Sequence, residues 1–329
     1  MPLIHHSSYQ APILFKNPHM QSIYPILFRP NWRVRYYRER IETVDKDFLD
    51  LDWSFVGSKR LAILTHGLEG HSGHAYMLGM AKALNRRGIT ALAWNFRGCS
   101  GELNRREYFY HVGMSSDLAH VVDHVKSNFD EIYLIGFSLG GNMTIKYLGE
   151  HASKLSPRIK CAVNFSAPID LQACSHKVSA QQNWVYFRKF MWTIQQKIAA
   201  KSKYFQMPAS LEQLKKVSSF KELDELFTAP LFGFISADEL WQVASSVPYI
   251  SEIRIPTLLV TAADDPLLTL ECYPTELAHK SEYFYFESPK NGGHVGFVSF
   301  NRQGEYWSEK RALQFIDQQR VLGTKSVLT

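Results

Sequence analysis

Residues 132–150, IYLIGFSLGGNMTIKYLGE, join a short apolar run to a glycine-flanked serine and then to a second apolar stretch. The run Ile132–Ile135 predicts a buried strand, and residues 139–150 predict a helix. Between them, Gly136 to Gly140 match the pattern G-x-S-x-G, in which a serine occupies a sharp strand-to-helix turn. Taken alone, a five-residue pattern with three fixed positions is a weak signal. The flanking strand and helix make Ser138 a candidate nucleophile.

Strand-like and helix-like segments alternate on both sides of this motif. Strands regularly separated by helices imply a mostly parallel sheet with helices on both faces, so the sequence predicts the α/β class. In such sheets the ends of the strands line a common cleft. The expected strands are 33–41, 50–56, 61–64, 89–94, 132–135, 159–165, 256–261 and 283–286, and the expected helices are 74–87, 115–127, 139–150 and 305–319.

The alternation breaks between residues 171 and 250. This stretch is rich in aromatic residues and has helical periodicity without a clear strand, so we predict an inserted helical cap over the cleft. We expect most of these aromatic side chains to hold the cap on the body and a minority to line an apolar pocket.

The first 30 residues have a different composition. They are aromatic and rich in proline, which opposes a helix, so we predict an extended N-terminal arm packed on the body. The predicted organisation is then an arm (1–30), an α/β core (31–170 and 251–329) and a helical cap insertion (171–250). The prolines of the arm are Pro2, Pro12, Pro18, Pro25 and Pro30.

A serine hydroxyl needs a base, and that base needs an acidic partner. His294 lies in a glycine-rich stretch after the last predicted strand, which suits a loop that presents an imidazole at the cleft. Asp264 and Asp265 follow the strand 256–261. The chain order serine, acid, histidine fits the motif. We favour Asp265, which precedes Pro266, with Asp264 as the alternative acid.

The negative charge that develops on a substrate oxygen needs N–H donors. We expect one from the backbone of Leu139, directly after the nucleophile, and one from Leu68 in the glycine-containing stretch 66–70. We expect His66 to support this oxyanion loop. We interpret Arg97 as a residue that ties neighbouring loops together by hydrogen bonds.

Composition and charge argue against several classes of function. The 329 residues include 37 basic and 31 acidic side chains, a mild net charge of +6, and no nucleic-acid-binding motif is visible. The four cysteines form no Cys-x-x-Cys pair, and the spacing of His66, His71 and His74 matches no zinc site. We therefore expect no nucleic acid and no metal.

The sequence also bears on location. No signal-peptide pattern and no run of about 18 apolar residues is visible, so we expect no integral membrane segment. Few, scattered cysteines in a long chain suit a reducing compartment. We predict a cytoplasmic protein and leave contact with a membrane surface open.

Six stretches together resemble the YheT-like branch of the α/β hydrolases, and the N-terminal one is the most specific to that branch. The resemblance spans nearly the whole chain and implies an α/β-hydrolase fold with a serine, aspartate and histidine triad and no cofactor. The triad would be Ser138, one of Asp264 and Asp265, and His294. Eukaryotic members are lipases with a membrane anchor. Since we expect no such anchor in this chain, their lipid substrates do not carry over directly. The stretches are 15–25, 66–70, 95–98, 136–142, 262–266 and 292–294.

These observations lead to an expected activity. We expect a serine hydrolase that cleaves carboxylic esters through an acyl-enzyme on Ser138, with small-molecule substrates that carry apolar acyl groups. One alternative is an acyltransferase that uses the same three residues with an alcohol acceptor. Another is a non-catalytic ligand-binding protein on the same scaffold.

Overall fold

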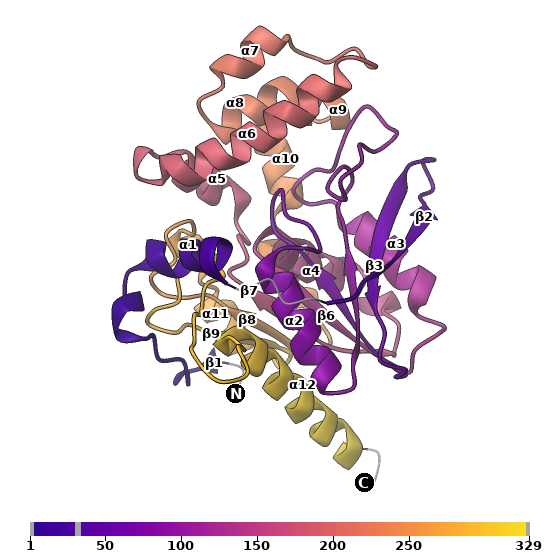
Figure 1. The fold of residues 1–329 in the computed structure, drawn as a ribbon, viewed down its shortest axis with the longest axis vertical. Coiled ribbons are helices and arrows are strands. Elements are labelled where there is room, and N and C mark those ends of the chain that lie inside the picture. The colour runs from indigo at the N-terminus through magenta and orange to yellow at the C-terminus, as the bar shows by residue number, and fades with distance from the viewer. Residues whose placement is uncertain (1–2, 30–33, 327–329) are drawn as a thin grey trace.

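The computed structural model describes residues 3–29 and 34–326. These residues form one nine-stranded sheet with the order β1-β9-β8-β7-β6-β4-β5-β3-β2, so that β6 is its central strand (Figure 1). β3 runs antiparallel to β2 and β5, and all other neighbouring pairs are parallel. The strands are β1 (Leu3–Ile4), β2 (Tyr37–Glu42), β3 (Phe48–Ser54), β4 (Arg60–Thr65), β5 (Thr90–Trp94), β6 (Glu131–Phe137), β7 (Ile159–Phe165), β8 (Thr257–Val260) and β9 (Phe284–Glu287).

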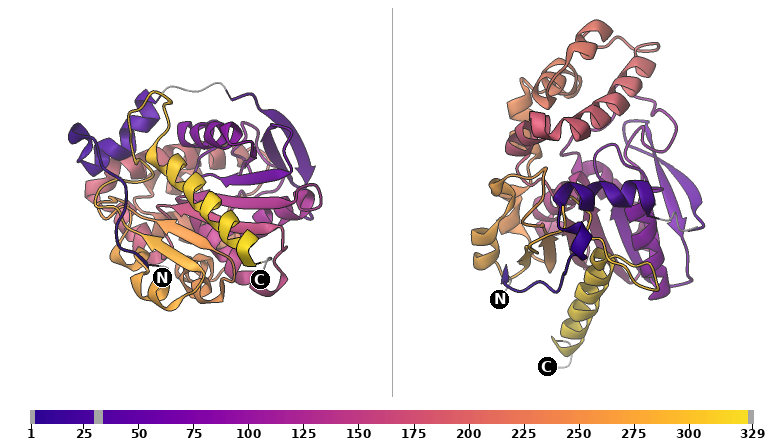
Figure 2. Two further views of the ribbon diagram at one scale, coloured as in Figure 1. Left: turned by 90° about the horizontal axis from the view of Figure 1, so that it is seen from below. Right: turned by 60° about the vertical axis from the view of Figure 1, so that its left-hand side comes forward.

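Helices cover both faces of the sheet (Figure 2). Successive strand residues point to opposite faces, so Ile63 and Leu134 join one hydrophobic core while Leu64 and Ile135 join the other. The first core is closed by α3 (Ser115–Val125), α4 (Leu139–Glu150) and α11 (Thr275–Lys280), and the second by α2 (Ala75–Arg86) and α12 (Trp307–Ser326). The predicted α/β class with a mostly parallel sheet is confirmed.

The predicted strands and helices recur, most of them with shifted ends. The segments 61–64, 132–135 and 159–165 correspond to β4, β6 and β7, and the expected pairing of 33–41 with 50–56 is the antiparallel pair β2–β3. Residue 33 lies outside the described residues. The two-residue strand β1 was not predicted. It pairs with β9 at the sheet edge.

The N-terminal stretch differs from the extended arm that its prolines predicted. It contains a 3₁₀ turn (Ile13–Phe15) and an eleven-residue helix, α1 (Pro18–Phe28). Asn17 caps this helix by accepting hydrogen bonds from the amides of residues 19 and 20, and Pro18 at its first position needs no N–H partner. Pro25 is accommodated inside the helix. Pro2 and Pro30 lie outside the described residues.

The segment 171–250, all of it described, contains helices and no strand. These helices stand above the end of the sheet where β6 passes into α4 (Figure 1). Phe187, Met191 and Phe227 pack together in a core of their own. The division into core and cap stays our interpretation of this arrangement. The helices are α5 (Leu171–Ser179), α6 (Trp184–Lys201), α7 (Leu211–Lys216), α8 (Phe220–Leu223), a π-helical turn (Asp224–Thr228), α9 (Ala229–Phe232) and α10 (Ala237–Ala244).

Among the described residues, no helix combines the length and the apolar character that a membrane crossing requires.

Candidate active site

Ser138 occupies the turn between the central strand β6 and α4. Its backbone has φ 51° and ψ −122°, a strained conformation for a residue with a side chain, and its N–H donates to the carbonyl of Phe165 at 2.8 Å. A side-chain carbon on Gly136 would lie 2.6 Å from the Gly140 carbonyl oxygen, and one on Gly140 would lie 2.3 Å from that of Thr65. Glycine at both positions is therefore required for this turn to form.

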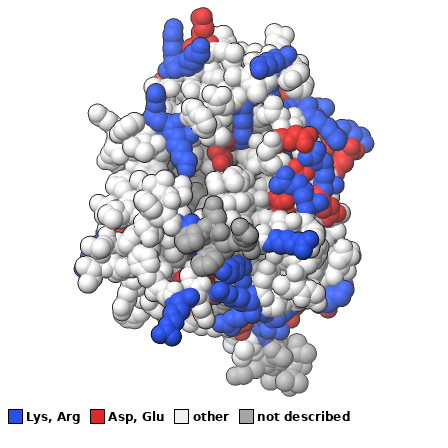
Figure 3. Space-filling model, viewed as in Figure 1, with Lys and Arg blue, Asp and Glu red and all other residues white. Residues whose placement is uncertain are grey.

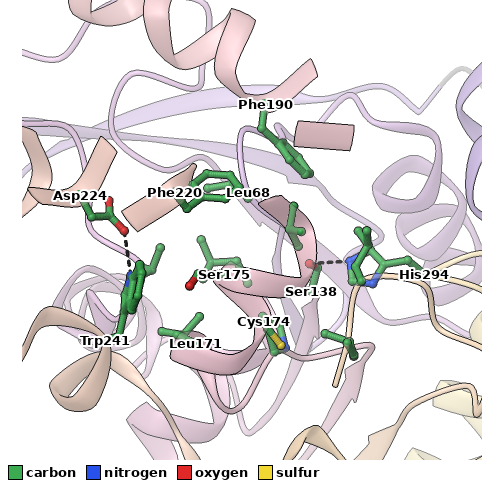
Figure 4. A pocket seen from close by; sticks show the side chains of 16 residues that line it. Leu68, Ser138, Leu171, Cys174, Ser175, Phe190, Phe220, Asp224, Trp241 and His294 are labelled. Atoms are coloured by element: carbon green, nitrogen blue, oxygen red, sulfur yellow. Dashed lines mark hydrogen bonds between the residues drawn. The ribbon is translucent and has the colours of Figure 1, made fainter. Parts of the chain in front are cut away.

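His294 lies beside Ser138, although 156 residues separate them in the chain. Its Nε2 is 2.8 Å from the Ser138 Oγ, as Figure 4 shows. Its Nδ1 is 3.1 and 2.9 Å from the two carboxylate oxygens of Asp265. The Asp265 side chain is fully buried, and the N–H of Leu267 donates to its Oδ1 at 3.0 Å. With a proton on Nδ1 facing Asp265, Nε2 is free to accept the serine proton.

Asp264 points away from the imidazole. Its carboxylate accepts hydrogen bonds from the Asn291 side chain at 3.1 Å and from the N–H of Gly293 at 2.9 Å. Burial raises the pKa of Asp264, the two hydrogen bonds act against that shift, and the neighbouring Asp265 adds to it. Of the two predicted acids, Asp265 touches the histidine, and Asp264 holds the loop that carries it.

Helix α1 holds the histidine loop from its other side. The Ser22 Oγ accepts the N–H of His294 at 2.8 Å, and the fully buried Gln21 accepts the N–H of Val298 at 2.9 Å. Gly293 has φ 56°, and a side-chain carbon there would lie 2.4 Å from the carbonyl oxygen of Pro18. No role was predicted for Gln21 or Ser22. The only signal was that both lie in the stretch 15–25, the one most specific to the resemblance.

In the loop after β4, hydrogen bonds occupy the backbone N–H groups on both sides of Leu68. The N–H of Gly67 donates to the Tyr76 hydroxyl at 3.1 Å, that of Glu69 to the Tyr110 hydroxyl at 3.0 Å, and that of Gly70 to a backbone carbonyl. Among the described residues, the N–H of Leu68 has no such partner, and the same is true of Leu139. Both predicted oxyanion donors therefore lack an internal acceptor, and both residues line the cavity at Ser138.

His66 supports this loop from below. Its Nδ1 lies 2.7 Å from the carbonyl oxygen of Gly67, and its Nε2 accepts the N–H of Phe96 at 3.1 Å. Complete burial lowers the pKa of His66 to about 3, so the ring is neutral and donates through Nδ1. Arg97 ties its loop to the turn between β2 and β3 through one 2.5 Å contact with Asp45, and to the first turn of α3 through two 2.8 Å contacts with Asp117.

A mostly apolar cavity opens beside Ser138. In Figure 4, Ser138 and His294 lie on one side of it and Asp224 with Trp241 on the other. The Trp241 Nε1 donates to the Asp224 carboxylate at 2.8 Å, and burial raises the pKa of Asp224 to about 6. Ser175 and Asp224 add polar atoms to the far part of the wall. The apolar lining includes Leu68, Val112, Leu171, Val178, Phe190, Phe220, Leu267 and Leu268.

Comparisons with known proteins place the chain in a family of hydrolases. The family described as "Serine aminopeptidase, S33" matches residues 57–272. YheT of Escherichia coli (strain K12), a protein named as an esterase, is 33% identical over 90% of this chain and 89% of its own. Human phospholipase ABHD3 is 28% identical over 83% of this chain and 70% of its own. A solved structure of an esterase from Pyrococcus furiosus is similar in fold, with a TM-score of 0.59 at 20% identity over 94% of this chain and 99% of that one.

Proposed function

The chain belongs to the YheT-like branch of the α/β hydrolases, within the family described as serine aminopeptidase S33, and from this premise we propose that Ser138 carries its ester hydrolysis as an acyl-enzyme. That it is a carboxylic ester hydrolase follows from the esterase and lipase relatives. The proposal concerns the residues and the substrates. The observation that supports it most is the 2.8 Å separation of the His294 Nε2 from the Ser138 Oγ.

In the first half-reaction, Ser138 Oγ attacks the ester carbonyl while His294 Nε2 takes the hydroxyl proton. The imidazolium that forms is stabilised by the carboxylate of Asp265. The oxygen that becomes negative is bound by the N–H groups of Leu68 and Leu139, at the N-terminus of α4. The intermediate then expels the alcohol, which receives its proton from His294, and leaves an acyl group on Ser138.

In the second half-reaction, water takes the place of the alcohol. His294 removes a proton from the water as it attacks the acyl carbonyl, and the same two N–H groups bind the oxygen again. Collapse releases the carboxylic acid and returns the proton to Ser138. Neither half-reaction requires a metal or an organic cofactor.

The cavity supports apolar acyl groups as substrates. Its wall beside Ser138 is built from aliphatic and aromatic side chains, among them Leu68, Leu267 and Phe190. Each methylene that an acyl chain buries there contributes about 0.8 kcal/mol. We therefore propose that kcat/KM rises with acyl length until the chain reaches the polar pair Asp224 and Trp241.

The test is covalent labelling followed by a series of substrates. A fluorophosphonate probe should modify Ser138 in the folded protein and should leave Ser138→Ala unlabelled. Esters of p-nitrophenol with acyl chains of increasing length should then be hydrolysed by the wild type alone. An absence of labelling in folded protein would favour the ligand-binding alternative. A product that shifts to a new ester when an alcohol is added would favour the acyltransferase.

We also propose a cytoplasmic location. All four cysteines are free thiols in buried positions, which suits a reducing compartment. Fractionation of cells that produce the protein tests this, because recovery outside the reducing compartment would contradict it.

A further inference from the structure

Helix α1 combines buried polar residues with exposed apolar ones, which is unusual for a surface helix. Its inward side carries the polar Gln21 and Ser22, which hold the histidine loop, and its outward side carries Ile26, Leu27 and Phe28. These three side chains are 58–65% exposed. A surface helix normally turns its apolar side chains to the core, whereas these three, at the C-terminal end of α1, stay largely exposed, and Phe28 contacts only the ring of Tyr24 among the described aromatic side chains.

Neighbouring elements enlarge the apolar area. Ile13 and Leu14, in the turn before α1, are 84% and 77% exposed. Phe300 is also exposed, and its ring packs against those of Phe15 and Tyr24. We call Ile13, Leu14, Ile26, Leu27, Phe28 and Phe300 the apolar face. Large exposed apolar clusters on a protein surface mark places where another apolar phase or molecule binds.

The beginning of α6 lies next to this face. The His19 Nδ1 of α1 is 3.1 Å from the Tyr186 hydroxyl of α6, and the two rings stack. On the outer side of α6, Trp184 and Trp192 are exposed, with Arg188 four residues from each. Tryptophan beside basic residues is typical of helices that lie in the boundary between water and lipid.

Charge defines what this side of the molecule can bind. No Asp or Glu occurs in residues 1–38 or in residues 171–211, whereas Lys16, Arg188 and Lys189 are exposed there. In Figure 3, the side of the molecule that carries α1 is white and blue, and red gathers with blue on the opposite side, over β2 and β3. Apolar side chains accompanied by cations only are complementary to an anionic bilayer.

We propose that the apolar face and the outer side of α6 bind peripherally to the surface of an anionic lipid bilayer. The apolar side chains would insert among the lipid headgroups and the basic side chains would contact lipid phosphates. A closed dimer through the same surface is disfavoured, since two-fold symmetry would pair this surface with itself and bring the cations Lys16, Arg188 and Lys189 of both copies into one interface.

Lipid contact here would lie close to the candidate active site. Phe190, between Lys189 and Trp192 on α6, lines the cavity at Ser138, and Ser22 of α1 contacts the His294 backbone. An ester held in a lipid surface would then reach the cavity without crossing much water. This last step rests on the proposed function, whereas the binding itself does not.

The experiment is flotation of the full-length protein with vesicles of phosphatidylcholine, alone or with phosphatidylglycerol. We expect binding to the anionic vesicles that weakens as salt is added. Leu27→Glu should reduce the fraction bound at least about tenfold, because it removes one buried apolar side chain and adds a charge that the lipid repels. Arg188→Glu should weaken binding to anionic vesicles more than binding to neutral ones.

Val44→Glu is the matched control, because Val44 is 91% exposed in the turn between β2 and β3, far from the apolar face. It should leave vesicle binding unchanged. Leu27→Glu should still hydrolyse a short, soluble ester at the wild-type rate. If it does and wild-type flotation is absent, lipid binding is wrong while the proposed function stands. A wild-type dimer that Leu27→Glu converts to a monomer would overturn the proposal in favour of self-association.

Discussion

Replacing one carboxylate oxygen of Asp265 by an NH₂ group, in Asp265→Asn, should nearly abolish catalysis. The same replacement in Asp264→Asn should not. In Asp265→Asn, an NH₂ group or a single carbonyl oxygen would face the His294 Nδ1, where two carboxylate oxygens now lie at 3.1 and 2.9 Å. An NH₂ group there favours the tautomer with its proton on Nε2, which cannot accept a proton from Ser138. Loss of the buried carboxylate also removes the charge that stabilises imidazolium.

The size of the effect follows from this geometry. The equivalent exchange in a serine protease triad lowers kcat about 10⁴-fold, or about 5.5 kcal/mol of barrier. Asp264→Asn loses only one of two hydrogen bonds to the loop, from Asn291 or from Gly293, which costs about 1 kcal/mol. Since burial already disfavours the charged form of Asp264, we expect its variant to lose at most about tenfold in kcat/KM.

The assay is steady-state hydrolysis of a short p-nitrophenyl ester by both variants and the wild type. Thermal melts of the same samples establish that each variant is folded. The two variants should differ in kcat by about a thousandfold. An Asp264→Asn enzyme that is as impaired as Asp265→Asn, or more so, would refute the assignment of Asp265 as the partner of the histidine.

Three further predictions concern the surroundings of the site. Ser22→Ala should lower kcat several-fold with little change in KM, because the backbone N–H of His294 loses its acceptor, and Ser22→Thr, which keeps the hydroxyl, should restore the rate. Gly293→Ala should lower kcat about a hundredfold, since a side-chain carbon there meets α1 and must displace His294. Unchanged kinetics would contradict this and would show that α1 moves aside without displacing the histidine. Burial raises the pKa of Asp224 from 3.8 to about 6, so the folded state binds this proton more tightly than the unfolded chain, and stability falls as pH rises between those values. Asp224→Asn, which keeps an oxygen for Trp241, should remove that decline and add up to about 3 kcal/mol at pH 7 in urea denaturation, and an identical pH profile would contradict the shift.

The sequence predicted the parts of the site that depend on local signals. The turn at Ser138 needs a strand before it, a helix after it and glycine at two positions, and all of these occur within 132–150. The position of His294 after the last strand, together with chain order, was enough to select it among 13 histidines. Choosing between Asp264 and Asp265 was harder, because adjacent residues in a loop point in opposite directions. The turn in which the N–H of Asp265 donates to Ala262 settles their directions, and it leaves no pattern in the sequence.

The role of α1 could not be read from the sequence for a physical reason. The prolines of this stretch predicted an extended chain, yet Pro18 takes the first position of α1 and Pro25 is accommodated inside it. Loop amides such as those of His294 and Val298 need acceptors when they are buried, and the inward side of α1 supplies them through Ser22 and Gln21. Ile26, Leu27 and Phe28, at the C-terminal end of α1, are left exposed, where a prediction based on periodicity would not expect apolar residues. The contact of α1 with the histidine loop therefore depends on which backbone amides the folded loop presents, and no pattern within residues 18–28 encodes that.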